Sequence, residues 1–326
     1  MRAAVITGYG TPPAPGDLPD PSPGDGQVLV AVTAAPIVPL DLLCASGTSY
    51  FGPPALPYVP GVQGVGRVVS GSTRPVGTRV WFTTTAGMHP GDGSMAELAL
   101  AAAEDLVDVP HGADDVLAAA LGTSAIAAWM SLTWRAELAE GEQVLVLGAG
   151  GVVGQVAVQL AKRLGARRVV GACRSEGARE RARVAGADAV VALSDSDPAE
   201  AVAARMAEAC EGPVDVVVDP LCGVPATAAA TLLGARGRLV NLGSSAGEVA
   251  SYSSAHLRSH TAAILGYTNN DITEEQRRDA LQAVLRLAVE TGLSVGHEVV
   301  PLEEVGSAWA RQAAGTADRR LVLRIG

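Results

Sequence analysis

Four glycines give this chain its clearest chemical signal. Gly148, Gly150, Gly151 and Gly154 separate the apolar run 144–147 from a helical pattern, and a second apolar run follows. Glycine lets a phosphate approach the backbone N–H groups, and the start of a helix adds unpaired donors and a partial positive charge. Glycines also serve in ordinary turns, but the order strand, glycine turn, helix, strand predicts a nucleotide-binding βαβ unit.

The spacing Gly148-x-x-Gly151-x-x-Gly154 is a variant of the usual dinucleotide fingerprint. We expect main-chain groups of the turn and of the first helical residues to hold the pyrophosphate. These residues are Gly148, Gly150, Gly151, Val152, Val153 and Gly154.

The end of the second strand indicates which dinucleotide binds. NAD sites place an acidic residue there to accept from the ribose 2′-hydroxyl, whereas NADP sites avoid that charge and supply an arginine. The apolar run 169–172 continues as Cys173-Arg174-Ser175, with no carboxylate before Glu176. Arg174 can bind a phosphate through charge-assisted hydrogen bonds, and Ser175 can add a donor. The alternative is a solvated arginine at a strand end; we favour NADPH.

Composition and charge limit the partners. The 326 residues are enough for one or two domains, and 24 Lys and Arg against 34 Asp and Glu give a net charge of −10. No basic cluster is present, so nucleic acid is not an expected partner. The start, MRAAVITGYG, lacks the pattern of a signal peptide, and no uninterrupted apolar stretch reaches membrane-spanning length. We expect a cytoplasmic protein without a membrane partner.

The cysteines predict neither a disulfide framework nor a zinc ribbon. Cys44, Cys173, Cys210 and Cys222 form no C-x-x-C pair. Cys173 and Cys222 lie beside apolar strand residues, which favours buried thiols. No activating histidine or cation pairs with Cys44 in the sequence, so we assign it to packing.

Apolar runs alternate with helical patterns through the second half of the chain, which predicts an α/β fold with a doubly wound parallel sheet. The expected strands are 144–147, 169–173, 189–193, 214–219, 238–242 and 262–265. The expected helices are 116–121, 126–140, 198–210, 225–233, 274–291 and 302–314.

The first hundred residues predict a small β barrel, because short β-rich runs alternate with turns rich in Gly, Pro and Asp. These runs are 2–7, 27–34, 65–69, 79–83 and 96–100, and the segment 11–26 is expected to be a loop or long turn. Two edge-like strands near the end, 297–301 and 320–325, are expected to return to the barrel. The expected domains are therefore 1–118 with 266–326, carrying substrate and catalysis, and 119–265, binding the dinucleotide.

This order resembles the medium-chain dehydrogenase/reductase superfamily and, within it, the zinc-independent quinone oxidoreductases and their enoyl-reductase relatives. The resemblance covers essentially the whole chain and rests on five stretches in the right order: 34–47, 58–69, 93–110, 148–166 and 299–309. It implies a Rossmann domain, a GroES-like, mostly β barrel-like domain, and a homodimer.

Zinc-dependent alcohol dehydrogenases of this superfamily carry a Cys-His pair and a later Gly-His-Glu. The equivalent segments here are Val38-Pro39 and Gly61-Val62-Gln63, and the four-cysteine structural zinc lobe is also missing. Zinc needs three or four N, S or O ligands close together, so we expect no metal. No histidine has a ligand-spaced partner in these motifs, and the one four-residue spacing is that of a helix surface; the histidines are His89, His111, His256, His260 and His297.

The resemblance also implies that loops after the later strands hold the nicotinamide end of the cofactor. The residues expected there are Leu221, Leu242, Gly243, Ser244, Tyr267 and Asn269. Two positions depart from the family pattern. The threonine that approaches the nicotinamide is Ala127 here, with Thr123 or Ser124 as possible substitutes. The tyrosine that assists the 2′-phosphate falls near Ala192-Leu193, so Arg174 carries more of that task.

Without a metal, the hydride acceptor must spread the developing charge by itself, as quinones and α,β-unsaturated carbonyls do. Tyr50 is the first candidate proton donor, because related quinone reductases have a tyrosine in a similar stretch, although packing at the pocket rim explains it equally well. Tyr267 is the second, with a cofactor-positioning role more suitable, and solvent is the third.

The main hypothesis is thus an NADPH-dependent, zinc-independent reductase of a small-molecule quinone or enone. The alternative is an NADPH-binding protein of the same fold with a non-redox role, regulatory or as a pathway cyclase, which the loss of the threonine at Ala127 favours. A zinc-free alcohol dehydrogenase ranks last, because nothing in the sequence polarises a plain carbonyl.

Overall fold

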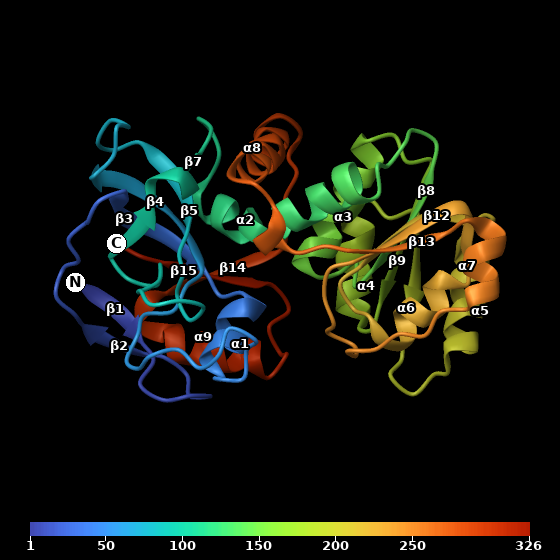
Figure 1. Ribbon diagram of the computed structural model, residues 1–326, viewed down its shortest axis with the longest axis horizontal. Helices are drawn as coiled ribbons and strands as arrows, with labels where there is room; N and C mark the ends of the chain where they lie inside the picture. Colours follow the sequence, from blue (N-terminus) through green and yellow to red (C-terminus); the bar gives the residue numbers. More distant parts are fainter. The chain divides into compact units, whose positions relative to one another are not determined.

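The chain forms a two-stranded, a six-stranded and a seven-stranded sheet (Figure 1). The computed structural model describes residues 1–326. One unit comprises Met1–Gly122 together with Glu274–Gly326, and the other comprises Thr123–Thr273.

The sheet of the second unit is six-stranded, with every pair parallel, in the order β10-β9-β8-β11-β12-β13. Its strands are β8 (Gln143–Leu147), β9 (Arg168–Cys173), β10 (Ala189–Ala192), β11 (Val214–Asp219), β12 (Leu233–Asn241) and β13 (Ala263–Gly266). After β8, the chain adds β9 and β10 on one side of that strand, and then adds β11, β12 and β13 on its other side. Ligands of such sheets bind at the carboxyl ends of the strands on either side of this reversal, here β8 and β11. The predicted doubly wound sheet is confirmed.

Helices cover both faces of this sheet. On β8, Leu145 and Leu147 belong to one apolar cluster with Val202 and Met206 of α5. Gly171 of β9 faces the opposite side, where an added Cβ would lie 3.3 Å from the side chain of Ala182 in α4. The helices of the unit are α3 (Val152–Arg163), α4 (Glu176–Val184), α5 (Ala199–Ala209), α6 (Gly223–Ala230), α7 (Ser254–His260) and the short η3 (Asn269–Asp271).

The sheet of the first unit has seven strands, with β14-β15-β3-β4-β5-β7 in order and β6 paired to β3. The strands are β3 (Gln27–Pro36), β4 (Gln63–Ser70), β5 (Arg79–Thr83), β6 (Leu98–Ala102), β7 (Val107–Asp108), β14 (His297–Pro301) and β15 (Arg320–Arg324). The helices are α1 (Pro39–Ala45), η1 (Ala103–Asp105), α8 (Glu274–Thr291), η4 (Leu302–Glu304) and α9 (Val305–Ala313). The predicted return of the last two strands to the N-terminal sheet is confirmed.

Two strand predictions were wrong. The segment expected to be a loop contains β2 (Ala14–Asp17), which pairs antiparallel with β1 (Arg2–Val5). The Pro and Gly residues of this segment are typical of a loop, and β2 is a largely exposed strand that pairs only with β1. β15 is not an edge strand, because β14 and β3 flank it and its first four residues are buried.

The first long helix, α2 (Asp115–Met130), contains a break at Gly122, whose φ of 34° and ψ of −131° are not helical. It continues as one π-helical turn, η2 (Ser131–Arg135), and ends before the expected Glu140. By length and composition, the stretch Asp115–Arg135 could cross a membrane, contrary to the expectation from the sequence, but 78% of its most apolar window is buried inside the protein. The core helix of a soluble protein meets the same criterion.

Candidate cofactor site

The four glycines of the turn serve different purposes. Gly148 has a φ of 62°, which only glycine adopts without strain. A Cβ on Gly150 would lie 2.4 Å from the carbonyl oxygen of Ala178, and one on Gly154 would lie 2.3 Å from that of Gly148. Gly151 is different, because an added Cβ would meet only the Gly148 carbonyl oxygen, at 3.3 Å. Open space therefore lies beside Gly151, where a phosphate would approach.

Helix α3 begins directly beside this space and its first turn has no side-chain cap. The Gly151 N–H donates to the Gly148 carbonyl at 2.9 Å, and the Gln155 N–H donates to the Gly151 carbonyl at 2.8 Å. The next N–H groups, of Val152 and Val153, are those that a helix start leaves for an external acceptor. The turn thus fits an anionic group of the size of a pyrophosphate.

Side chains from α3 and α4 hydrogen-bond to the backbone of the glycine turn. The Gly150 carbonyl accepts from Gln155 Nε2 at 2.9 Å and from Arg181 Nε at 3.0 Å. At the end of β9, Cys173 is buried beside the turn, and burial raises the pKa of its thiol. All four cysteines are buried free thiols, which confirms that prediction for Cys173 and Cys222.

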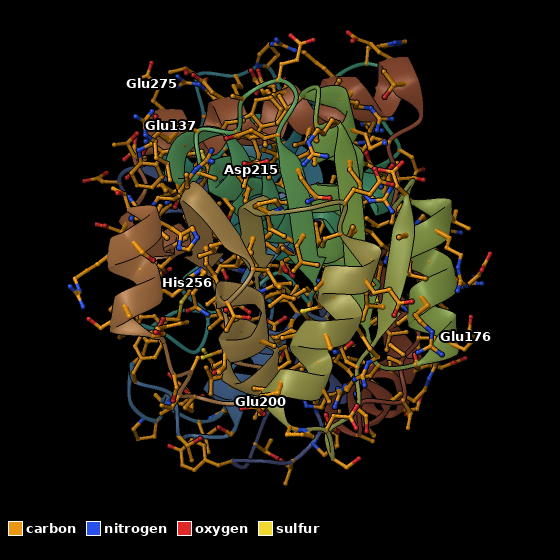
Figure 2. All side chains as sticks on the ribbon, turned by 90° about the vertical axis from the view of Figure 1, so that its right-hand side faces the viewer. Glu137, Glu176, Glu200, Asp215, His256 and Glu275 are labelled. Carbon is orange, nitrogen blue, oxygen red and sulfur yellow. The ribbon has the colours of Figure 1, made fainter.

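Arg174 and Ser175 follow β9 directly. Ser175 caps α4, its Oγ accepting the Ala178 N–H at 3.1 Å. The Arg174 guanidinium lies 3.3 Å from Asp195 Oδ2, and the side chains are 65% and 77% exposed. The Arg174 carbonyl accepts from Arg179 Nη1 at 2.8 Å, which fixes the backbone under the exposed guanidinium. In Figure 2, Glu176 marks the start of α4.

Asp195 is the charged neighbour that the sequence analysis missed. The sequence criterion for dinucleotide preference concerns the end of the second strand, whereas Asp195 comes shortly after β10. No local sequence signal indicates this contact, because it depends on β9 and β10 being parallel neighbours whose carboxyl ends lie at one edge of the sheet.

A buried carboxylate shapes the loop after β11. Asp219 is fully buried, and its Oδ1 accepts the N–H groups of Leu221 at 2.9 Å and Cys222 at 2.8 Å. Its Oδ2 accepts from Asn241 Nδ2 of β12 at 2.8 Å. Burial raises the pKa of Asp219. These bonds fix Leu221 at the carboxyl end of the central strands.

This loop reaches the glycine turn. A Cβ on Gly148 would lie 3.1 Å from Leu221 Cδ2. A Cβ on Gly243 would lie 2.8 Å from the Pro220 carbonyl oxygen, so glycine permits the close approach of the loops after β11 and β12. The Leu242 N–H donates to the Asp219 carbonyl at 2.9 Å. Leu221, Leu242 and Gly243 thus lie together with the turn.

The remaining expected cofactor residues are held by neighbours. The Ser244 hydroxyl donates to Glu248 at 2.8 Å. The Tyr267 hydroxyl donates to Asn269 Oδ1 at 2.6 Å, and Asn269 Nδ2 donates to the Thr123 carbonyl at 3.1 Å. This chain of hydrogen bonds fixes the loop after β13, which suits positioning better than proton transfer for Tyr267.

In the first unit, Asp41 joins the two segments that bear zinc ligands in zinc-dependent members. Its carboxylate accepts the N–H groups of Val38 at 2.8 Å and Val62 at 2.9 Å. Arg320 is buried beside it and donates to the Ile37 carbonyl at 2.8 Å. Burial raises the pKa of Asp41 to about 6 and lowers that of Arg320 to about 10, while their opposite charges counteract both shifts.

These positions have no set of metal ligands. Val38 and Val62 are aliphatic, and the Gln63 side chain accepts from the Trp81 indole at 3.2 Å. Nowhere in the structure do three or more His, Cys, Asp or Glu side chains form a group that could hold a metal. His256 and His260 stack on α7 with ring centroids 4.2 Å apart, in agreement with the helical spacing.

The tyrosines differ in their surroundings. Tyr50 is 76% exposed and its ring lies 4.2 Å from that of Phe51, centroid to centroid. Tyr58, which the sequence analysis did not single out, is buried, and its hydroxyl has no hydrogen-bond partner. Burial raises the pKa of Tyr58, and raises the pKa of the nearby Cys44 thiol to about 11. Cys44 is thus an inert packing thiol.

Comparison with known proteins identifies relatives along the chain. Residues 24–111 match the family model of the alcohol dehydrogenase GroES-like domain, and residues 152–288 match that of the zinc-binding dehydrogenases. The quinone oxidoreductase of Pongo abelii is 32% identical over 251 residues, which cover 75% of this chain and 73% of that protein.

Two solved structures are similar over 99% of both chains. A mycobacterial quinone oxidoreductase superposes with a TM-score of 0.86 at 25% identity. A mycobacterial protein complexed with NADPH superposes with a TM-score of 0.84 at 26% identity. The predicted fold class, a Rossmann-like domain with a GroES-like domain, is confirmed.

Proposed function

The chain belongs to the medium-chain dehydrogenase/reductase superfamily, in its quinone oxidoreductase-like branch, and from this we propose that it is an NADPH-dependent reductase of quinones or α,β-unsaturated carbonyls that works without zinc. The observation that carries the proposal is the open space at Gly151 beside the uncapped start of α3, with Arg174 directly after the adjoining strand β9.

Each part of the cofactor has its own residues in this proposal. The N–H groups of the glycine turn, Val152 and Val153 hold the pyrophosphate, while Arg174 and Ser175 bind the 2′-phosphate. Main-chain groups of the loops after β11 and β12 orient the nicotinamide end. The residues of these loops are Leu221, Leu242, Gly243 and Ser244, with Tyr267 and Asn269 fixing the loop beside them. The NADPH complex of the mycobacterial relative supports NADPH as the cofactor.

When bound, NADPH supplies a hydride, which adds to a conjugated carbon while negative charge moves to an oxygen. The protein orients the partners. The oxygen then takes a proton, for which we propose Tyr50 or solvent. Tyr50 is exposed enough to exchange its proton with water.

The aliphatic side chains of Val38 and Val62 narrow the substrate class. Zinc would require donors there, and without a Lewis acid a plain ketone is a poor acceptor. A quinone or enone delocalises the charge by itself. The relatives that are named as quinone oxidoreductases support this choice, and they disfavour the non-redox alternative that rested on Ala127.

We further propose that the discontinuous unit carries the substrate site and that the protein is a cytoplasmic homodimer. β13 lies at one edge of the six-stranded sheet with its side chains half-buried, so it can accept a second copy of the chain. Sedimentation of the purified protein tests this: a monomer at micromolar concentration contradicts it.

The activity test mixes the purified protein with NADPH and a panel of quinones, enones and saturated ketones. We expect NADPH absorbance to fall with quinones or enones and to stay constant with the ketones. A Gly151→Val variant is the matched control, since its side chain would occupy the open space without altering the acceptor site. No oxidation across the panel contradicts the proposal.

A further inference from the structure

Asp195 forms an ion pair with Arg174, whose guanidinium the proposed 2′-phosphate would bind. Arg174 Nη1 donates to Asp195 Oδ2 at 3.3 Å, and the structure gives Arg174 no other acidic partner. The neighbouring arginines are engaged elsewhere: Arg179 pairs with Glu176, and Arg181 donates to the Gly150 carbonyl. Arg174 is therefore the cation at this corner whose ion pair a ligand can replace.

The loop that carries Asp195 is anchored on both sides of it. Ser194 Oγ and Ser196 Oγ are hydrogen-bonded at 2.9 Å, and the Asp197 N–H donates to the Ser194 carbonyl at 3.3 Å. Asp197 accepts from Arg205 of α5 at 2.5 Å. These contacts form a turn that presents Asp195 to Arg174. Glu176 and Glu200 mark the helices that follow the two loops in Figure 2.

The ion pair is easily exchanged. Both side chains are mostly exposed, and such pairs contribute little to stability because water and salt screen them. A phosphate carries more charge than a carboxylate and matches the guanidinium fork with two hydrogen bonds. A bound 2′-phosphate would therefore displace Asp195, but it would do so against the repulsion of a nearby like charge. NADH lacks this phosphate and meets no such repulsion.

The geometry points to Asp195 as a residue that sets cofactor preference: it competes with the 2′-phosphate for Arg174 and so lowers the selectivity for NADPH over NADH. This inference rests on the proposed function, since it concerns the same dinucleotide site. It adds a carboxylate after the third strand to the residues that determine specificity.

The test is Asp195→Asn, with binding measured by titration calorimetry for NADPH, NADH, adenosine 2′,5′-bisphosphate and 5′-AMP. We expect the affinities for the two 2′-phosphorylated ligands to rise about three- to tenfold at low salt, the size of one exposed charge pair and its repulsion. The affinities for NADH and 5′-AMP should not rise. Glu200→Gln is the matched control, because it removes one negative charge from the helix that follows the same loop, at an exposed residue that does not pair with Arg174.

A double variant tests the competition directly. In an Arg174→Ala background, Asp195→Asn should have a clearly smaller effect on adenosine 2′,5′-bisphosphate, because no guanidinium remains to be released. An unchanged selectivity in Asp195→Asn, an equal gain in Glu200→Gln, or an undiminished gain without Arg174 would each overturn the inference.

The failure of this inference is distinguishable from that of the proposed function. If wild-type protein oxidises NADPH with quinones and Asp195→Asn leaves the selectivity unchanged, the inference alone fails. If no acceptor is reduced but the 2′-phosphorylated ligands bind more tightly to Asp195→Asn, the reductase function fails and the role of Asp195 stands.

Discussion

Replacing Arg174 by alanine should separate the two pyridine dinucleotides. A hydrogen bond to a charged group contributes about 1.5–3 kcal/mol. Because Arg174 is 65% exposed, solvent screening reduces its contribution to the binding free energy of NADPH. We expect a loss of about 1–2 kcal/mol for NADPH, which corresponds to a roughly 5- to 30-fold higher Kd.

The assay is a fluorescence or calorimetric titration with both NADPH and NADH, and we expect the Kd of NADH to stay nearly constant. Arg167→Ala is the matched control: Arg167 precedes β9, whereas Arg174 follows it, so the same charge is lost at the opposite end of one strand. Equal weakening of both dinucleotides, or an equal effect of Arg167→Ala, would refute the assignment of Arg174 to the 2′-phosphate.

Four further substitutions test the site and the residues that support it. Gly150→Ala should lower the free energy of unfolding by about 1–3 kcal/mol in urea titrations, because the new Cβ would lie 2.4 Å from the Ala178 carbonyl oxygen. Gly151→Ala should leave the stability nearly unchanged and weaken NADPH binding. The reverse pattern would contradict the separate roles of these two glycines. Asp41→Asn removes a carboxyl whose pKa in the folded protein, about 6, lies above its ordinary value of 3.8. Such a group stabilises the fold most at low pH, so the stability of wild type relative to the variant should decrease by about 2 kcal/mol as the pH rises from about 4 to 7; urea titrations across this range that show no change would contradict the burial effect. Tyr58→Phe should leave the unfolding temperature unchanged or raise it, because the lost hydroxyl has no partner, and a large decrease in thermal unfolding experiments would reveal a hydrogen bond that the structure lacks.

Local patterns made the dinucleotide half of the fold predictable. Strand, glycine turn and helix follow one another within a few residues, so period and turn chemistry identify them without knowledge of distant contacts. β11 (Val214–Asp219) and α8 (Glu274–Thr291) have the predicted limits for the same reason. β2 was missed because its pairing with β1 outweighs a local composition that is typical of a loop.

The contacts that matter most for specificity are non-local and were not predictable. Asp195 meets Arg174 only because β9 and β10 are neighbours in the sheet. The sequence places Arg174 and Ser175 at the end of a strand, but it does not show that the Asp195 carboxylate, in the loop after β10, pairs with Arg174. The domain limits and the roles of the individual cofactor residues stay predictions.

The Asp41 carboxylate explains how this unit can do without a metal at the zinc-ligand positions. It accepts main-chain N–H groups from both Val38 and Val62, so the two segments are held together irrespective of the side chains at those positions. Arg320, on the strand that returns from the C-terminal part of the chain, balances the buried charge. The aliphatic side chains of Val38 and Val62 offer no donor to a zinc ion. The chemistry left to the site is hydride transfer to an acceptor that stabilises its own negative charge.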